Sequence, residues 1–253
     1  MRRHVLTMVA LALPAALSAQ QTILRLAPPQ GQVSRYRIEM STQIDMAMAS
    51  IEARSFMELT SRVTAAQGEE RTVETVVDSF RIDSPSMPMP EMPSLIGSST
   101  TVRMNTRGEV LETTYSDEGL TETFGGVAGA AGQGFPAGIR LPEQPVAVGH
   151  QWNDSNTVQT DAGPMGEATV TSRMRYTLER LFTREGARIA LVAIQGTMTQ
   201  AAGAMAADGT MQGSMEFDLD AGRWVTNRMT IEMKMNVGTE ATMTITTNAR
   251  LLP

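Results

Sequence analysis

The sequence has no cysteine among its 253 residues and only two histidines, His4 and His150. The missing cysteine excludes a disulfide framework, a thiolate nucleophile and an acylated N-terminal cysteine. A lone histidine beside Gly149 is far more often a surface residue than a general base or a metal ligand. Gly-x-Ser-x-Gly, His-Glu-x-x-His and Walker-type motifs are also missing. The sequence therefore predicts a non-enzyme, with no catalytic residues and no cofactor.

Long apolar runs are missing too, since no stretch approaches the roughly 20 apolar residues that a membrane-spanning helix needs. A shorter apolar run at residues 5–17 follows Arg2 and Arg3 and ends near Ala19, which is the pattern of a secretory signal peptide. We expect cleavage after Ala19 and export to the periplasm or the medium. Without the two arginines, the basic count is 21 − 2 = 19 against 27 acidic residues, a net charge of −8. This charge argues against nucleic acid or an anionic membrane surface as partner.

Apolar and polar residues alternate with period two over long stretches, which predicts antiparallel strands with one solvated face. Residues 36–48 carry apolar side chains at even positions, and residues 51–65 carry them at odd positions, with Phe56 on the wrong face. The second half repeats the pattern in the sets Ala168, Val170, Met174, Tyr176, Leu178, Phe182; Met211, Met215, Phe217, Leu219; Val225, Met229, Ile231, Met233, Met235, Val237; and Met243, Ile245.

The two halves also resemble each other in the order of their turns. The Gln67-Gly68-Glu69 turn corresponds to Arg184-Glu185-Gly186, and an Asn-x-x-Gly tip at residues 104–110 corresponds to an Asp-x-Gly tip at 219–225. We expect an all-β fold with one or two short helices, a strongly curved antiparallel sheet or half-open barrel of about nine to eleven strands. It would consist of a signal peptide (1–19) and one β domain (20–253), made of duplicated meanders at 20–115 and 141–253. A helix and glycine-rich connection at 116–140, capped by Ser116, would join them.

Methionine is the compositional anomaly, with 20 residues, of which only Met1 and Met8 fall in the leader. Met fills irregular gaps in cores, yet it specifies a fixed packing poorly and is over-used at adaptable binding surfaces. Both interpretations stay open, a filled core and an accommodating concave face. On the second interpretation the candidate ligand-binding residues are Met40, Met46, Met48, Met57, Met174, Met215, Met229, Met233 and Met235, together with Met89 and Met92.

The stretch Ser84-Pro85-Ser86-Met87-Pro88-Met89-Pro90-Glu91-Met92-Pro93-Ser94 allows a second hypothesis. Thioethers are soft ligands for Cu(I), so Met87, Met89 and Met92 form an alternative metal site. Each of them precedes a proline, which favours an extended conformation and resists convergence of three sulfurs on one ion. A stiff apolar flap over the open side of the sheet is the favoured interpretation.

The segment Leu141-Pro142-Glu143-Gln144-Pro145-Val146-Ala147-Val148-Gly149-His150-Gln151-Trp152 resembles the signature L/F-P-x-x-P-V-x-V-G-x-x-W. This signature belongs to an uncharacterised family of exported bacterial β-rich proteins, classed as a domain of unknown function. His150 stands where that family is expected to have Asp, and Trp152 matches and is expected to anchor the first strand of the second half. The family implies no activity.

The overall pattern also looks like the half-barrels of periplasmic lipoprotein carriers, where a curved sheet holds acyl chains. This second resemblance is of architecture alone. We therefore expect an exported, non-catalytic binding or carrier module for an apolar small molecule or lipid-like ligand. The alternatives are a structural or interaction domain with a filled core and Cu(I) binding by the Met-Pro stretch.

Overall fold

The computed structural model describes residues 21–47, 49–84, 95–116, 139–161, 167–202, 205–236 and 240–253. These residues form eleven β-strands and no helix, and none of them lies in a helix with the length and hydropathy needed to cross a bilayer. The strands are β1 Val33–Met46, β2 Ala49–Gln67, β3 Glu70–Asp83, β4 Ser99–Asn105, β5 Val110–Tyr115, β6 Gln151–Asp161, β7 Glu167–Arg184, β8 Ala187–Ala202, β9 Met205–Asp218, β10 Arg223–Asn236 and β11 Glu240–Leu251. The all-β prediction is confirmed.

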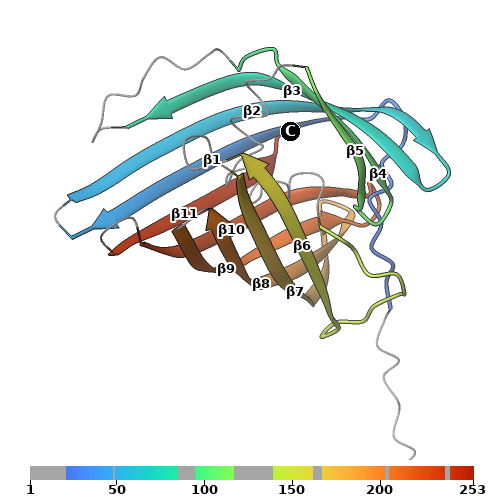
Figure 1. Ribbon diagram of the computed structural model, residues 1–253. Helices are drawn as coiled ribbons and strands as arrows, with labels where there is room; N and C mark the ends of the chain where they lie inside the picture. Colours follow the sequence, from blue (N-terminus) through green and yellow to red (C-terminus); the bar gives the residue numbers. More distant parts are fainter. Residues whose placement is uncertain are drawn as a thin grey trace, which may run out of the picture.

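All eleven strands belong to one antiparallel sheet in the order β5-β4-β3-β2-β1-β11-β10-β9-β8-β7-β6. Each half is a meander of sequential neighbours, and the halves join where β1 pairs with β11. The sheet does not close into a barrel, so β5 and β6 are its two edges. Figure 1 shows the first meander arching over the second, with β1 and β11 at the bend between them.

The turns fall where the sequence places them. Residues 67–70 connect β2 to β3 and residues 184–187 connect β7 to β8, while the Asn and Asp tips connect β4 to β5 and β9 to β10. At the second tip, Asp218 Oδ1 accepts hydrogen bonds from the backbone N–H groups of Asp220 and Ala221, which is the ordinary role of Asp in a tight turn. The predicted helix and glycine-rich connection at 116–140 lie outside the described residues except for Ser116, Ile139 and Arg140.

The strand pairing gives the sheet one apolar and one polar face. On the inner face, one row across the strands reads Ile44, Met243 and Met233. The outer face is charged, with Arg37 and Glu58 joined at 2.6 Å across β1 and β2. Phe56, the exception to the alternation, lies on this outer face with the Arg81 guanidinium 4.7 Å from its ring centroid, so a cation–π contact accounts for it.

At two of the register shifts in the sheet, a β-bulge moves side chains away from the faces that strict alternation predicts. Between Leu178 and Arg180 the register shifts, and Leu181 rather than Phe182 packs against the core. Between Trp224 and Thr226 it shifts again, so Trp224 rather than Val225 is buried. The inner-face predictions for Phe182 and Val225 are therefore wrong, because one extra residue in a strand reverses the parity beyond it.

The core shows that the sheet is curved. Val63 of β2 and Val73 of β3 belong to the same buried cluster as Tyr176 of β7 and Phe217 of β9, although these strands are far apart in the sheet order. Such contacts require the apolar face to fold toward itself. A strongly curved or half-open arrangement is thus confirmed.

Two segments without regular structure fill the space between the meanders at one end, which we call the capped end. Residues 21–32 and 139–150 meet in a bridge between Thr22 and Val146, and their side chains Leu24, Leu26, Ile139, Leu141 and Val146 are all buried. The turns at 67–70, 105–110, 184–187 and 218–223 lie at this end.

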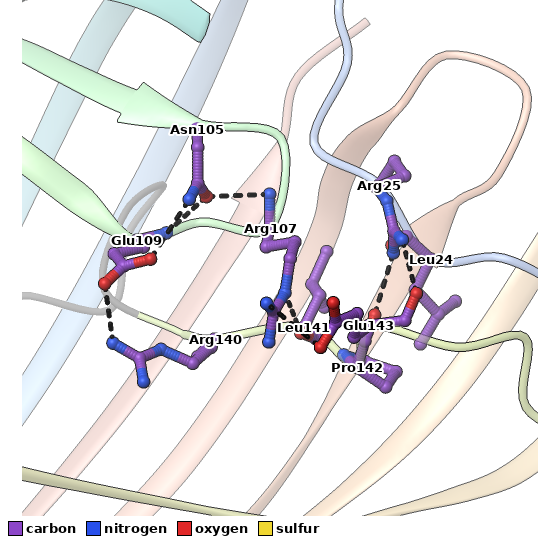
Figure 2. Close-up of polar contacts among 9 residues, drawn as sticks. All are labelled: Leu24, Arg25, Asn105, Arg107, Glu109, Arg140, Leu141, Pro142 and Glu143. Carbon is purple, nitrogen blue, oxygen red and sulfur yellow. Dashed lines mark hydrogen bonds and ion pairs between the residues drawn. The ribbon is translucent and has the colours of Figure 1, made fainter. Parts of the chain in front are cut away.

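The segments 21–32 and 139–150, which we call the cap, are held in place by arginine side chains that donate hydrogen bonds to backbone carbonyls (Figure 2). Arg25 donates to the carbonyls of Leu24 at 2.7 Å, Pro142 at 2.8 Å and Glu143 at 2.6 Å. Arg107 donates from Nε to the Leu141 carbonyl at 3.2 Å, and the Leu141 N–H donates back to the Arg107 carbonyl. These bonds satisfy carbonyls that have no strand partner, as buried backbone groups require.

Candidate functional site

The inner face carries a group of half-buried methionines, which we call the methionine face. It lies over β1, β2, β10 and β11, and its members are Met40, Met46, Met57, Met229, Met235 and Met243. Cross-strand pairing makes the group continuous: Met40, Thr247 and Met229 form one row, and Met46, Ala241 and Met235 form another. Half-buried Ile38, Ile44 and Ile51 lie between them.

Other predicted site residues take a different place. Met215 and Met233 are each only 1% exposed and belong to the packed core. Met174 is half-buried and touches both core clusters. The members of the methionine face are more exposed than Met215 and Met233, but most of them also touch the core: Met40, Met57, Met229 and Met243 pack against buried clusters, Met229 against two of them as Met174 does. Both interpretations of the methionines stay predictions. Met48, Met87, Met89 and Met92 lie outside the described residues, so the copper hypothesis stays a prediction.

Glycines in β8 and β9 leave room for atoms of the neighbouring strands, including two methionine side chains. A Cβ at Gly196 would come within 2.5 Å of the Met174 Sδ, and one at Gly209 within 2.8 Å of the Met233 Cγ. At Gly213 an added Cβ would strike the Arg228 carbonyl oxygen of the neighbouring strand. Glycine inside a strand often marks such a close approach. The sequence analysis did not consider these three residues, although a glycine in the middle of a predicted strand indicates such a close approach.

One polar side chain lies among these apolar residues. Asn227 of β10 pairs with Met215 on one side and with Ala249 on the other, and it is 8% exposed. Its Oδ1 is buried and accepts no hydrogen bond within the described residues. Sequence reasoning missed Asn227, although an Asn at an odd position before Met229, Ile231 and Met233 interrupts the apolar pattern.

A second buried polar group lies at the capped end. Arg223 donates to Ser34 Oγ at 3.0 Å, while its Nε is buried without a partner in the described part of the chain. It borders a cavity of about 40 Å³ that is also lined by Gln32, Ser61 and Tyr36. Burial raises the pKa of Tyr36 and keeps its hydroxyl protonated.

The next question is whether ionisable side chains of the described residues are grouped as a metal site would require. Among them, no three His, Cys, Asp or Glu side chains are grouped so as to hold a metal ion. The pKa of Asp45 is lowered by hydrogen bonds from Ser50 and Gln43, and that of Asp220 by Arg188. Both carboxylates are held ionised on the surface, where neither faces the methionine face.

The outer face has an open depression of about 640 Å³ over β7 to β11. Its lining includes Gln195, Gln212, Arg228, Thr230 and Asn248, which the register places opposite the core, and Glu179 at the bulge of β7. Polar side chains are expected on the wet face of an antiparallel sheet.

The segment that carries the sequence resemblance closes the edge of the second meander. Trp152 stacks on Tyr176 with ring centroids 5.4 Å apart and donates from Nε1 to the Arg140 carbonyl at 3.0 Å. These contacts fix the start of β6, which is the anchoring role expected of Trp152. His150 is exposed, with its ring centroid 6.5 Å from that of Trp152. Family membership stays a prediction.

Comparison with known proteins adds little. No protein-family model matches the chain, and no curated protein matches it. Among solved structures, DynF from the dynemicin biosynthesis pathway of Micromonospora chersina aligns over 97% of this chain and 92% of its own, at 8% identity and a TM-score of 0.23. A likeness at that level carries no argument about fold or function.

Proposed function

We propose that this protein is an exported, non-catalytic carrier that binds an apolar, lipid-like ligand against the methionine face. The observation that carries the proposal is the half-buried state of six inner-face methionines in one continuous group. Apolar side chains that stay accessible in contiguous patches mark binding sites more often than isolated exposed ones do.

The chemistry of the lining fits a guest of variable shape. A thioether on an unbranched side chain changes rotamer easily and is polarisable, so it adapts to different apolar surfaces. Along β1 the inner face is half-buried from residue 40 to residue 46, and the other members of the methionine face lie on the strands beside it or one further away. At about 3.4 Å per residue, six residues extend over about 20 Å, which suits a long acyl chain lying along the strands.

The architecture supports the same proposal. The sheet is open, with β5 and β6 as its edges, and buried Leu24, Leu141 and Val146 fill the capped end. A concave apolar surface closed at one end is the usual form of a small-molecule site. Export, which rests on the leader-like residues 1–19, would place such a carrier outside the cytoplasm.

The fully buried Met215 and Met233 favour a second candidate, a structural domain whose inner face is packed throughout. One experiment separates the two. The protein is purified from its native envelope without detergent, extracted with organic solvent and examined by mass spectrometry, and the extracted protein is titrated with the apolar dye N-phenyl-1-naphthylamine. A carrier yields a co-purifying lipid-like compound and saturable dye fluorescence that the compound reverses. A packed domain yields neither, and that result would refute the carrier.

A further inference from the structure

We infer that the ligand of the methionine face bears a hydrogen-bond donor, such as the hydroxyl of a fatty alcohol or the protonated head of a similar amphiphile, and that Asn227 Oδ1 receives it. This inference rests on the proposed function and narrows the class of ligand.

Asn227 lies next to the methionine face in space as well as in sequence. The row Ile38, Ala249, Asn227 crosses β1, β11 and β10 directly beside the row Met40, Thr247, Met229. Asn227 therefore stands at the end of the methionine face that is nearest the capped end.

The amide has an unmet hydrogen-bonding requirement. More than nine tenths of Asn227 is buried, and its Oδ1 has no donor within the described residues. A buried acceptor without a partner costs more than the same position filled by an apolar side chain of similar shape. Native proteins leave few such groups, and each one calls for a physical reason.

The other unpartnered buried side-chain atom of the described residues is Arg223 Nε. Arg223 borders the cavity of about 40 Å³ at the capped end, and its guanidinium donates to Ser34. Asn227 is not among the residues that line that cavity. The neighbours of Asn227 on the inner face, Met215, Met229 and Ala249, offer no strong donor.

A ligand donor would resolve this conflict. Apolar sites for small molecules hold their ligands by area and orient them with a few placed polar groups. A chain lying along β1 from Met46 past Met40 toward Ile38 would cover half-buried residues and bring its polar end to the row of Asn227. The pair would then gain one neutral hydrogen bond, worth about threefold to tenfold in affinity.

The test uses two isomers, 1-dodecanol and methyl undecyl ether, which differ only in that the ether has no donor. Their dissociation constants are measured by displacement of N-phenyl-1-naphthylamine from the wild-type protein and from two variants, Asn227→Leu and Asn248→Leu. Asn248 lies on the opposite face of the neighbouring strand and controls for the substitution itself. We expect the wild type and Asn248→Leu to prefer the alcohol by about threefold to tenfold, and Asn227→Leu to bind both isomers equally.

Two measurements keep the outcome interpretable. The thermal midpoint of ligand-free Asn227→Leu should equal or exceed that of the wild type, because the change removes an unmet acceptor. In the wild type, the Asn227 side-chain amide resonances should shift with the alcohol and not with the ether. Equal affinities in the wild type, or a preference that survives in Asn227→Leu, would overturn the inference and leave the carrier intact. If neither isomer binds the wild type, both the carrier and the inference fail.

Discussion

Met233 and Met235 offer a matched test of the division between core and methionine face. Both lie on the inner face of β10, two residues apart, and both become alanine by the same change. Met233 is 1% exposed and packs over Gly209, whereas Met235 is half-buried beside Ala241.

The expected costs differ because only one site is enclosed. Met233→Ala removes a fully buried side chain and leaves a cavity, which costs about 2–5 kcal/mol. Met235→Ala loses part of a transfer free energy and leaves no enclosed space, which costs about 1 kcal/mol or less. For a domain of this size each kcal/mol lowers the thermal midpoint by about 2–4 °C. We expect a fall of about 10 °C for Met233→Ala and of about 3 °C for Met235→Ala.

Thermal unfolding followed by circular dichroism measures these shifts, and dye titration of the same samples below their transitions measures binding. Met235→Ala should weaken dye binding several-fold while remaining well folded, and Met233→Ala should keep most of its affinity despite lower stability. Equal midpoint shifts for the two variants would contradict the division. If Met235→Ala binds the dye as tightly as the wild type does, the dye does not bind at the methionine face.

Three further predictions concern the sheet, the cap and the surface. Gly213→Ala should lower the thermal midpoint by at least several degrees, since its Cβ would strike the Arg228 carbonyl; a wild-type midpoint would contradict that close approach. Arg25→Ala should cost roughly 1–3 kcal/mol and speed hydrogen exchange at the Leu141 and Val146 amides, whereas Arg54→Ala, which breaks an exposed pair with Glu52, should change little. The folded pKa of Asp220 is depressed by Arg188, so its stabilisation is present above the unfolded pKa of about 3.9 and is lost as pH falls through the folded value. The difference in midpoint between the wild type and Asp220→Asn should therefore be constant near neutral pH and shrink below about pH 4, and a difference that persists at low pH would refute the linkage.

The strands were predictable because a sheet with one solvated face imposes period two on the sequence. The hairpin turns were predictable because Gly, Asn and Asp mark tight turns. Alternation fails at the bulges after Leu178 and Trp224, where one added residue reverses the parity. It also says nothing of the cap, since residues 21–32 and 139–150 are held by arginine-to-carbonyl bonds that have no period.

The sequence predicted which face of the sheet carries the candidate site, but not which residues of that face are accessible. Met233 and Met235 share parity, strand and residue type, so no sequence pattern separates the buried one from the accessible one. The difference depends on the curvature of the sheet, which brings some rows of the inner face against distant strands and leaves others uncovered. Asn227 was missed for a related reason: an Asn within a strand is unremarkable until its neighbours are known to be Met215 and Ala249.

The position of Asn227 bears on why the inner face is rich in methionine at all. If the face were only a core, leucine in place of methionine and an apolar residue in place of Asn227 would stabilise the fold with the same pattern. Both departures from a well-specified core occur in adjacent rows of β1, β11 and β10, with half-buried Met40 and Met229 in one row and buried Asn227 in the next. Independent packing faults have no reason to gather in one place. The proposed ligand would explain both, because an adaptable apolar lining and one unmet acceptor each cost stability in the empty protein and would regain it when an amphiphile binds.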